Sequence, residues 1–314
     1  MSTQRNNGTN PTPKEFASYE QVTGALKVHN ALDVHAAIDF GISNTDAVAY
    51  VEGAVHHWTR PTEGDPEPEL ARAILATGGV ELPALQQLAV TGGRHRLLPR
   101  QIGTCAVVAV DEVQAIGRGG QAMTSVLGAE DATPVLVVSA GSGTAVVAAR
   151  GDQYTHVTGT GVGGGTLLGL SRLLLGTVDH REIDALALRG DPNGADLSLS
   201  DAIGVPLGRL PADATAVNFG RLARRALTAS REDLAAALVT LVSQVIALIA
   251  INAARAERIE HIIVIGHLTD MTSVRDALAL VGNYYDVSIG LPADAGYATA
   301  LGALLYSASR PIGR

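Results

Sequence analysis

The fold is decided by one stretch of the chain, residues 154–170, which reads YTHVTGTGVGGGTLLGL. A short polar strand pattern runs into five glycines, and an apolar helical pattern follows. Glycine allows backbone N–H groups to come close to a ligand, and a helix N-terminus adds the positive end of its dipole. We therefore expect Gly163, Gly164 and Gly165 to help bind anionic oxygen, and phosphate is the group that this pattern favours.

The composition is that of a globular protein. The chain has 314 residues, of which 46% are hydrophobic, 17% are charged and 35 are glycine. These values exclude a disordered or fibrous chain and leave room for two domains or one duplicated fold. The net charge of −8 argues against a nucleic-acid-binding protein, because phosphate backbones are bound by basic surfaces. Lys14 and Lys27 are the only lysines, so a cation acting within the fold must be arginine, histidine or a metal ion.

Cysteine usage and the apolar segments indicate the compartment. Cys105 is the only cysteine, which excludes an intrachain disulfide and indicates a reducing, cytoplasmic environment. Its apolar neighbours predict a buried side chain rather than a reactive thiol. Residues 1–33 are polar, and we expect a disordered tail there and no signal peptide. The apolar stretch 234–254 contains four polar side chains, which favours a buried or interface helix over a membrane span.

The hydrophobic periodicity predicts alternating strands and helices. In the first half we expect strands at 34–40, 46–51, 54–58 and 87–91, a helix at 66–77, and a strand or helix start at 106–110 ahead of a helix at 111–126. In the second half we expect strands at 134–139, 144–149, 153–158, 261–265 and 285–289, and helices at 164–176, 179–189, 216–228, 231–259, 273–281 and 296–307.

One order of elements occurs twice. A strand, a loop of small residues and a hairpin follow one another at 34–58 and again at 134–158. We therefore predict an α/β fold made by duplication, in which two halves face each other and leave a cleft for a ligand.

The first loop of small residues reads Asp39-Phe40-Gly41-Ile42-Ser43-Asn44-Thr45-Asp46. A carboxylate at the end of a buried strand can anchor hydrated Mg²⁺, because hard cations prefer carboxylate and water oxygen. Asp39 is the candidate metal residue, and Gly41, Ser43, Asn44 and Thr45 can surround a phosphate. The alternative is a simple β-turn, for which glycine, serine and asparagine are equally suited.

The second loop, Ser139-Ala140-Gly141-Ser142-Gly143-Thr144, holds the equivalent place in the other half. Two such loops on opposed hairpins would hold a triphosphate from both sides, although each alone is also explained as a hairpin turn. The glycine run formally matches the dinucleotide fingerprint, but its preceding strand is polar and Asp179 begins a helical pattern. A P-loop requires lysine, and none follows Lys27.

Two side chains are candidates for proton transfer. Glu112 stands where an apolar strand meets a helix, which suits a general base facing a cleft. The alternative is that the helix dipole favours acids there, with either Asp111 or Glu112 as the cap. His156 precedes the glycine run and can donate to an oxyanion or titrate, or serve as a polar strand residue. We expect the other clustered histidines, His56, His57 and His95, on the surface.

These features together resemble the type II pantothenate kinases, the Fumble-like branch of the acetate-kinase/hexokinase/actin superfamily. The resemblance covers roughly residues 36–307. It is carried by ordered motifs, namely Gly141-Ser142-Gly143, residues 157–170, ADLSLSDAIG at 195–204, LPADATAVNFG at 210–220 and GYATALGALL at 296–305.

The resemblance implies a duplicated actin/hexokinase-like, ribonuclease H-like α/β fold of two lobes with a cleft between them. It implies a first lobe at 34–130, with a C-terminal helix at 296–308 packing back on it. The second lobe would occupy 131–295 and carry a helical insertion. The family is dimeric, and residues 231–259 resemble its long interface helix, so a homodimer is implied.

The implied activity is ATP- and Mg²⁺-dependent phosphorylation of pantothenate to 4'-phosphopantothenate, the first step of coenzyme A biosynthesis. Glu112 matches the catalytic glutamate, which would take the proton of the substrate hydroxyl as that oxygen attacks the γ-phosphorus. Asp39 and its loop would hold Mg²⁺ and phosphate, and Gly266 matches a glycine near the nucleotide. The remaining nucleotide contacts would come from Gly141, Ser142, Gly143, Thr144 and the glycines at 163–165, and the acceptor contacts from Ser142, His156, Thr158 and Thr160.

The chain departs from the family pattern at charged positions. The family's first loop reads Asp-x-Gly-Gly-Thr followed by a lysine, whereas here Ile42, Ser43 and Asp46 stand at the second glycine, the threonine and the lysine. The family's arginine before Thr-Gly-Thr is replaced by His156. A charge-assisted hydrogen bond is worth about 1.5–3 kcal/mol, so its loss would weaken transfer roughly ten- to a hundredfold or mark a different acceptor.

Two other functions stay open at the level of sequence. One is a kinase of the same fold that acts on another small hydroxyl compound, such as pantetheine or pantoate, which Ile42, Asp46 and His156 favour. The other is a nucleotide-binding sensor without turnover, against which the intact Glu112 argues. All three functions involve a small-molecule ligand and neither nucleic acid nor a membrane.

Overall fold

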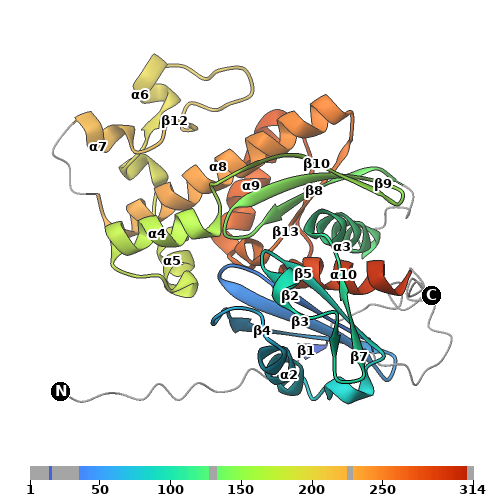
Figure 1. Cartoon of the computed structure of the whole chain (residues 1–314). Helices are drawn as coiled ribbons and strands as arrows, with labels where there is room; N and C mark the ends of the chain where they lie inside the picture. The colour runs from blue at the N-terminus through green and yellow to red at the C-terminus, as the bar shows by residue number, and fades with distance from the viewer. Residues whose placement is uncertain (1–13, 16–34, 127–132, 225–228, 310–314) are drawn as a thin grey trace, which may run out of the picture. The chain divides into compact units, whose positions relative to one another are not determined.

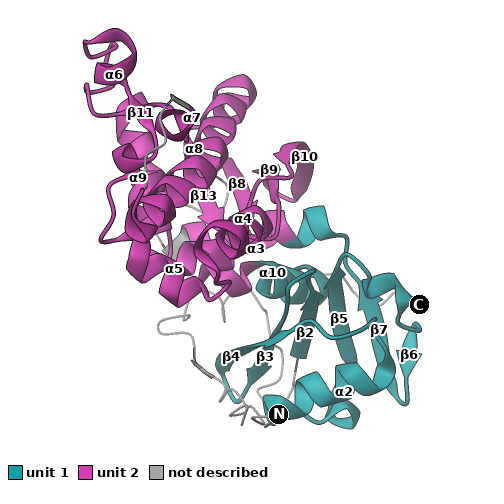
Figure 2. Ribbon diagram, turned by 90° about the vertical axis from the view of Figure 1, so that its left-hand side faces the viewer, with its two compact units in different colours: residues 1–115, 299–314 teal, residues 116–298 magenta. Residues whose placement is uncertain are grey.

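The protein is described here by a computed structural model of residues 14–15, 35–126, 133–224 and 229–309 (Figure 1). The chain forms two compact units, unit 1 (residues 1–115 and 299–314) and unit 2 (residues 116–298), which Figure 2 distinguishes by colour. The disordered tail expected at 1–33 lies outside the described residues, except for a two-residue strand, β1 (Lys14–Glu15). Lys14 therefore belongs to a strand of unit 1, where it lies opposite His57.

Unit 1 is built on a seven-stranded sheet with the order β1-β4-β3-β2-β5-β7-β6. Its central strands β2, β3 and β4 form an antiparallel meander, while β2, β5 and β7 run parallel. The strands after β1 are β2 (His35–Phe40), β3 (Asn44–Val51), β4 (Ala54–Pro61), β5 (Gln87–Gly92), β6 (Gln101–Ile102) and β7 (Cys105–Ala109).

The two faces of this sheet differ. Alternate residues of β2, including Ile38 and Phe40, pack in a buried cluster with Ile74 and Leu75 of helix α2 (Pro68–Thr77). Because successive side chains of a strand point to opposite faces, Asp39 faces away from α2. Figures 1 and 2 both show α10 (Ala298–Ala308) on that second side. Two short 3-10 helices, η1 (Leu82–Ala84) and η2 (His95–Leu97), complete the connections of unit 1.

Unit 2 is built on a five-stranded sheet with the order β10-β9-β8-β13-β14. Its first three strands are antiparallel, and β13 runs parallel to both of its neighbours. The strands are β8 (Val135–Ala140), β9 (Thr144–Arg150), β10 (Gln153–Thr160), β13 (His261–Ile265) and β14 (Ile289–Gly290).

Helix α8 (Arg231–Glu257) is the core of unit 2. It packs against α4 (Gly164–Leu175), α5 (His180–Ala187) and α9 (Thr272–Tyr285). By length and composition it could cross a membrane, and it is the one described helix that could. Of its most apolar window, however, 61% is buried inside the protein, as expected for a core helix. The helix α3 (Glu112–Val126) begins in unit 1 and continues in unit 2, where η4 (His267–Asp270) and η5 (Ala295–Tyr297) also lie.

A small insertion in unit 2 differs from the sequence prediction. The helix expected at 216–228 is instead strand β12 (Thr215–Val217) followed by α7 (Gly220–Arg224), and residues 225–228 lie outside the described part. The buried carboxylate of Asp196 explains the difference, since it accepts hydrogen bonds from the Thr215 hydroxyl and from the backbone N–H of Phe219. The other elements of the insertion are η3 (Pro192–Gly194), α6 (Leu199–Ile203) and β11 (Leu197–Ser198), which pairs with β12.

Two further predictions are wrong. The strand expected at 285–289 begins later and is shorter, because Tyr285 is the last residue of α9 and Asp286 caps that helix in the left-handed conformation (φ 59°). Only Ile289 and Gly290 form β14. His57 and His95 were expected on the surface, but both are buried. His57 lies on the covered second face of the unit 1 sheet, and the Nδ1 atom of His95 lies 2.5 Å from the Gly92 carbonyl oxygen.

The predicted duplication is confirmed by the topology. Unit 1 contains the order β4-β3-β2-β5-β7, and unit 2 has the matching order β10-β9-β8-β13-β14. In both, three antiparallel strands are followed by two parallel ones. The first loop and the second loop join equivalent strands, β2 to β3 and β8 to β9.

Candidate functional site

The first loop is a tight turn between β2 and β3. A Cβ atom on Gly41 would lie 2.5 Å from the carbonyl oxygen of Asn44, so glycine is required there by the close approach of the backbone. Ile42 is 82% exposed, and Ser43 is exposed beside it. The buried Thr45 hydroxyl lies 3.0 Å from the hydroxyl of Thr62.

Thr62 holds this loop and was missed by the sequence reasoning. Its hydroxyl donates to the Gly41 carbonyl oxygen (2.8 Å), and its backbone N–H donates to the Ser43 carbonyl oxygen (3.0 Å). The strand register indicates its place. Asn44 pairs with Pro61 in the antiparallel pair of β3 and β4, so Thr62 comes opposite Ser43. Thr62, which follows β4, and Thr45, on β3, together therefore fix the first loop.

Asp39 lies next to a second carboxylate. In the antiparallel register of β2 and β3 it is directly opposite Asp46, and in the parallel register of β2 and β5 it is beside Thr91. Gly92, at φ +92°, leaves room for the Asp39 carboxylate, because a Cβ atom there would lie 2.5 Å from Oδ1. Residues paired in this way share a face of the sheet.

The two acids that follow β7 have different surroundings at the start of α3. Asp111 caps the helix, because its Oδ1 atom accepts a hydrogen bond from the backbone N–H of Val113 (3.1 Å). Glu112, the first residue of α3, is exposed. Of the two arrangements left open by the sequence, Asp111 as the cap is the one observed. Glu112 and Asp39 lie at the carboxyl ends of β7 and β2, two strands apart, which corresponds to about 10 Å between strand axes.

The second loop packs against the start of α4. The Gly164 N–H donates to the Gly141 carbonyl oxygen (2.8 Å), and the Gly165 N–H donates to the Ser142 carbonyl oxygen (2.9 Å). A Cβ atom on Gly163 would lie 2.8 Å from three backbone atoms of Gly143. These glycines thus allow two stretches of backbone to touch, and two N–H groups of the helix start are used within the protein.

Threonine hydroxyls hold the rest of the glycine run. Thr144, which is buried, donates to the Val162 carbonyl oxygen (2.8 Å), and Thr160 accepts from the Val162 N–H (3.2 Å). Thr166 donates to the Gly161 carbonyl oxygen (3.0 Å). The loop is therefore fixed by side chains on both of its flanks.

Gly266 lies at the same end of the unit 2 sheet. Ile265 pairs with Ser139 in the register of β13 and β8, and a Cβ atom on Gly266 would clash with the Ala140 carbonyl group. Its φ of +104° also favours glycine. The structure thus brings Gly266, residues 141–144 and residues 163–165 together within unit 2.

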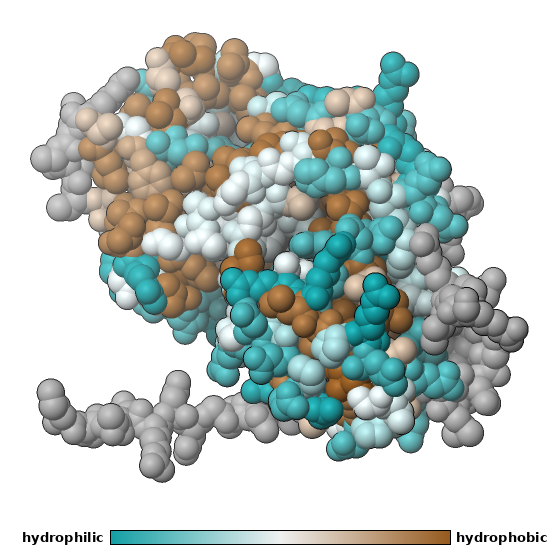
Figure 3. Space-filling view, viewed as in Figure 1, coloured by the Kyte–Doolittle hydropathy of each residue, from teal (hydrophilic) through white to brown (hydrophobic). Residues whose placement is uncertain are grey.

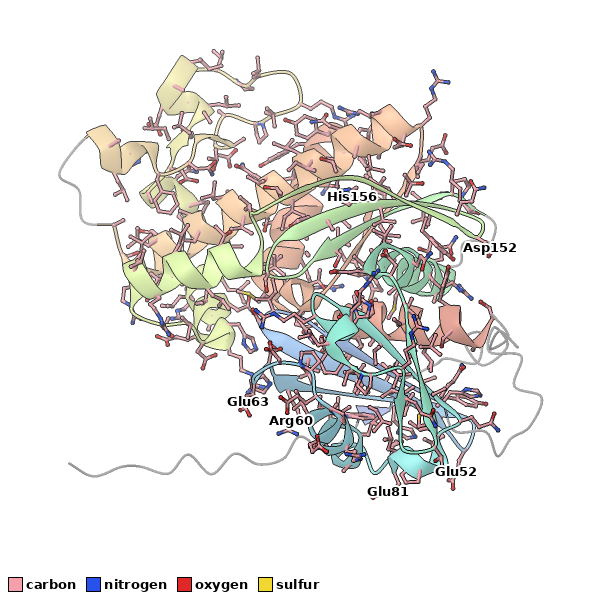
Figure 4. The ribbon with its side chains drawn as sticks, in the orientation of Figure 1. Glu52, Arg60, Glu63, Glu81, Asp152 and His156 are labelled. Atoms are coloured by element: carbon pink, nitrogen blue, oxygen red, sulfur yellow. The ribbon has the colours of Figure 1, made fainter. Side chains whose placement is uncertain are left out.

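His156 lies on the exposed edge strand β10 (Figure 4). The register shifts between His156 and Thr158, which marks a β-bulge at Val157. The His156 Nε2 atom lies 3.6 Å from the position that a Cβ atom on Gly159 would take. The imidazole is therefore exposed and directed along the strand toward the glycine run, while Thr158 and Thr160 are half-buried.

Metal-binding residues are few in the described part of the chain. No group of three or more His, Cys, Asp or Glu side chains is arranged there to hold an ion. A cation at Asp39 would therefore depend on one or two carboxylates together with phosphate and water, which is the usual manner of Mg²⁺. Cys105 is buried, as predicted, and burial raises the pKa of its thiol.

Comparisons with known proteins bear on the family and the fold. The Fumble family model matches residues 106–306. The chain is 30% identical over 228 residues to a type II pantothenate kinase of Bacillus cereus, and the match covers 71% of this chain and 82% of the relative.

Two solved structures share the fold at 14% identity. One is the activator of the 2-hydroxyisocaproyl-CoA dehydratase from Clostridium difficile with bound ADPNP (TM-score 0.61, 90% of this chain and 100% of that one). The other is the ROK hexokinase from Thermus thermophilus (TM-score 0.51, 88% and 100%).

Proposed function

The chain belongs to the Fumble family, and from this premise we propose that it transfers the γ-phosphoryl group of ATP to pantothenate. The product is 4'-phosphopantothenate, and the reaction is the first step of coenzyme A biosynthesis. The family match over residues 106–306 carries the proposal, because it includes Glu112, the glycine run and Gly266. The type II pantothenate kinase of Bacillus cereus, matched over 71% of this chain, supports the same activity.

Glu112 is assigned as the general base. Asp111 already caps α3, so the exposed Glu112 carboxylate is not needed for that purpose. It would accept the proton of the acceptor hydroxyl as that oxygen attacks the γ-phosphorus. The other protein groups contribute position and charge, as expected for phosphoryl transfer.

Asp39 is assigned to Mg²⁺. When bound, the cation would neutralise charge on the β- and γ-phosphates. The Asp39 carboxylate fits this role because it is half-buried at the end of β2, and Gly92 leaves space around its Oδ1 atom. Gly41, Ser43 and Asn44 would position the phosphates, and Thr45 would act through Thr62 by keeping the loop in shape.

The unit 2 loops are assigned to the nucleotide and the acceptor. Gly141, Ser142, Gly143 and Gly266 would lie against the phosphates, while Gly163, Gly164, Gly165 and Thr144 keep that backbone in place. Ser142, His156 and Thr158 would contact the acceptor, and Thr160 supports them through the Val162 N–H. His156 takes the place at which the family has arginine.

A cytoplasmic homodimer is part of the proposal. On α8 the half-buried Leu241, Val245 and Leu248 recur at the spacing of one helix face, which suits contact with a second copy. Figure 3 also shows apolar side chains gathered over unit 2, and large exposed patches mark interaction surfaces. The most exposed of them include Leu173, Val205 and Leu207. Light scattering on the purified protein should give the mass of two chains. The mass of one chain would contradict the homodimer.

A second acceptor is favoured by Ile42, Asp46 and His156. Asp46 and His156 replace two positive charges that the family pattern supplies, and Ile42 replaces a glycine, so a hydroxyl compound without the pantothenate carboxylate would suit the site. Pantetheine is one such compound.

Purified protein, ATP, Mg²⁺ and a panel of pantothenate, pantetheine, pantoate and sugars test both functions. We expect the highest kcat/KM with pantothenate and a loss of at least a hundredfold in Glu112→Gln. Glu81→Gln is the matched control, since Glu81 is exposed and far along the chain from the loops (Figure 4). Equal turnover in Glu112→Gln and the wild type would remove Glu112 from the mechanism. A higher kcat/KM with pantetheine than with pantothenate would make pantetheine the acceptor.

A further inference from the structure

A row of polar side chains crosses the unit 1 sheet on the face away from α2. Thr91 on β5, Asp39 on β2, Asp46 on β3 and Thr59 on β4 are paired in register, each with the next. Paired residues of neighbouring strands point to the same face, with Cβ atoms about 5 Å apart. The row therefore has two adjacent carboxylates in its middle and a hydroxyl at each end.

Two adjacent buried carboxylates cost free energy, and a cation bound between them would offset part of that cost. Asp46 is 6% exposed and Asp39 is half-buried, and like charges directly opposite each other in a sheet repel. Both flanking hydroxyls are short of partners. Thr91 is fully buried, and among the residues that the structure describes the Oγ1 atoms of Thr91 and Thr59 have no hydrogen-bond partner. A buried hydroxyl without a partner costs about 1–3 kcal/mol, so its presence beside the carboxylates needs an explanation.

We propose that Asp46 joins Asp39 in binding one divalent cation directly, with the Thr91 hydroxyl as a further oxygen donor. The ion would lie at the carboxyl ends of β2 and β5, and water would complete its coordination. Two carboxylates with hydroxyl and water oxygen form a donor set that Mg²⁺ and Mn²⁺ accept. Asp46 stands where the family pattern has a lysine, so a metal ion would supply the positive charge that the side chain does not.

The inference rests on the proposed function only in taking Asp39 as a metal residue. It makes a claim that the kinase activity does not require, namely that the cation binds before ATP. Mg²⁺ is usually held by one or two carboxylates together with nucleotide phosphates and water. A second direct carboxylate raises the affinity in the absence of nucleotide.

The test is Mn²⁺ binding to the full chain without nucleotide, measured by electron paramagnetic resonance and by calorimetry. We expect one site per chain in the wild type. Asp46→Asn should weaken it at least tenfold, and Thr91→Val, which keeps the side-chain shape, should weaken it by a smaller factor. Asp152→Asn is the matched control, because Asp152 is exposed in the turn between β9 and β10 (Figure 4) and should bind Mn²⁺ like the wild type.

Each result decides the inference independently of catalysis. Equal Mn²⁺ affinity in Asp46→Asn and the wild type, or no binding by the wild type, overturns it even if pantothenate is phosphorylated. The two carboxylates could share a proton instead of a cation. In that case the wild type would not bind Mn²⁺, and this result overturns the inference. Mn²⁺ binding that depends on Asp46 supports the inference even if no acceptor is turned over.

Discussion

Replacing Gly163 by alanine should destabilise unit 2 and loosen the second loop. The glycine has an extended backbone (φ −177°) that any residue adopts, so the effect must come from the added methyl group alone. That Cβ atom would lie 2.8 Å from the Cα, C and O atoms of Gly143, and these are backbone atoms that cannot rotate away. The contact must open by roughly 0.6 Å to reach the 3.4 Å of an ordinary one.

The cost follows from the hydrogen bonds beside this contact. Opening it lengthens the bonds from Gly164 to Gly141 (2.8 Å) and from Gly165 to Ser142 (2.9 Å), which join the same two stretches of backbone. Overpacking typically costs about 1–3 kcal/mol, and we expect about 2 kcal/mol here. For a domain of this size that lowers the melting temperature by roughly 4–8 °C. If the loop binds phosphate, KM for ATP should rise more than KM for the acceptor.

Gly169→Ala is the matched control in the same helix. In the part of the chain that the structure describes, nothing lies within 4 Å of a Cβ atom at Gly169, so alanine should stabilise the helix by about 0.5–1 kcal/mol. The two substitutions add the same methyl group to α4 with opposite expected signs, as measured by thermal and urea unfolding. A Gly163→Ala protein as stable as the wild type, or one that behaves like Gly169→Ala, would refute the close packing of loop and helix.

Three further predictions concern Thr62, His156 and Asp196. Thr62→Val should lower the free energy of unfolding by about 1–2 kcal/mol, because the hydrogen bonds to Gly41 and Thr45 are lost. Thr77→Val, which removes a surface helical bond, should change it by less than about 0.5 kcal/mol in the same urea titration. His156→Arg should raise kcat/KM for pantothenate roughly tenfold by restoring a charge-assisted bond, and a decrease would contradict the role given to this position. Burial raises the pKa of Asp196 above its unfolded value of 3.8, so its contribution to stability is complete below that pH and is lost as pH rises through the folded pKa. Asp196→Asn should therefore make urea stability less dependent on pH above 4, and an unchanged pH profile would contradict it.

Most of the architecture could be predicted because local pattern and tertiary structure agree. The two hairpins and the core helix α8 follow from apolar periodicity and turn residues, and the duplication follows from the order of elements. The failures arise where a distant group decides the local conformation. Asp196, about twenty residues earlier in the chain, holds Thr215 and Phe219 in place of a helix, and no window of sequence around residue 216 contains that contact.

The local structure of the candidate loops depends on contacts that the sequence does not show. The glycine run was expected to present its N–H groups to an anion, but two of them bond to the carbonyl oxygens of Gly141 and Ser142. Asp111 and Glu112 could not be told apart by composition, since both are favoured at a helix start, and the bond from Val113 distinguishes them. The pairing of Asp39 with Asp46 could be found only once the strand register was known, because it depends on the length of the turn at Gly41.

The first loop and the glycine run are held in the same way, although their sequences differ. In unit 1 the Thr62 hydroxyl binds the carbonyl oxygen of Gly41, and in unit 2 the hydroxyls of Thr144 and Thr166 bind those of Val162 and Gly161. A carbonyl group that is turned toward a hydroxyl cannot face an incoming phosphate. If it did, its oxygen atom would repel the phosphate oxygens. Fixing the carbonyl groups in advance lowers the ordering cost of binding an anion, since less of the loop must rearrange. We therefore expect the threonines beside the glycines, including Thr62 outside the motif, to contribute to anion binding through the shape of these loops.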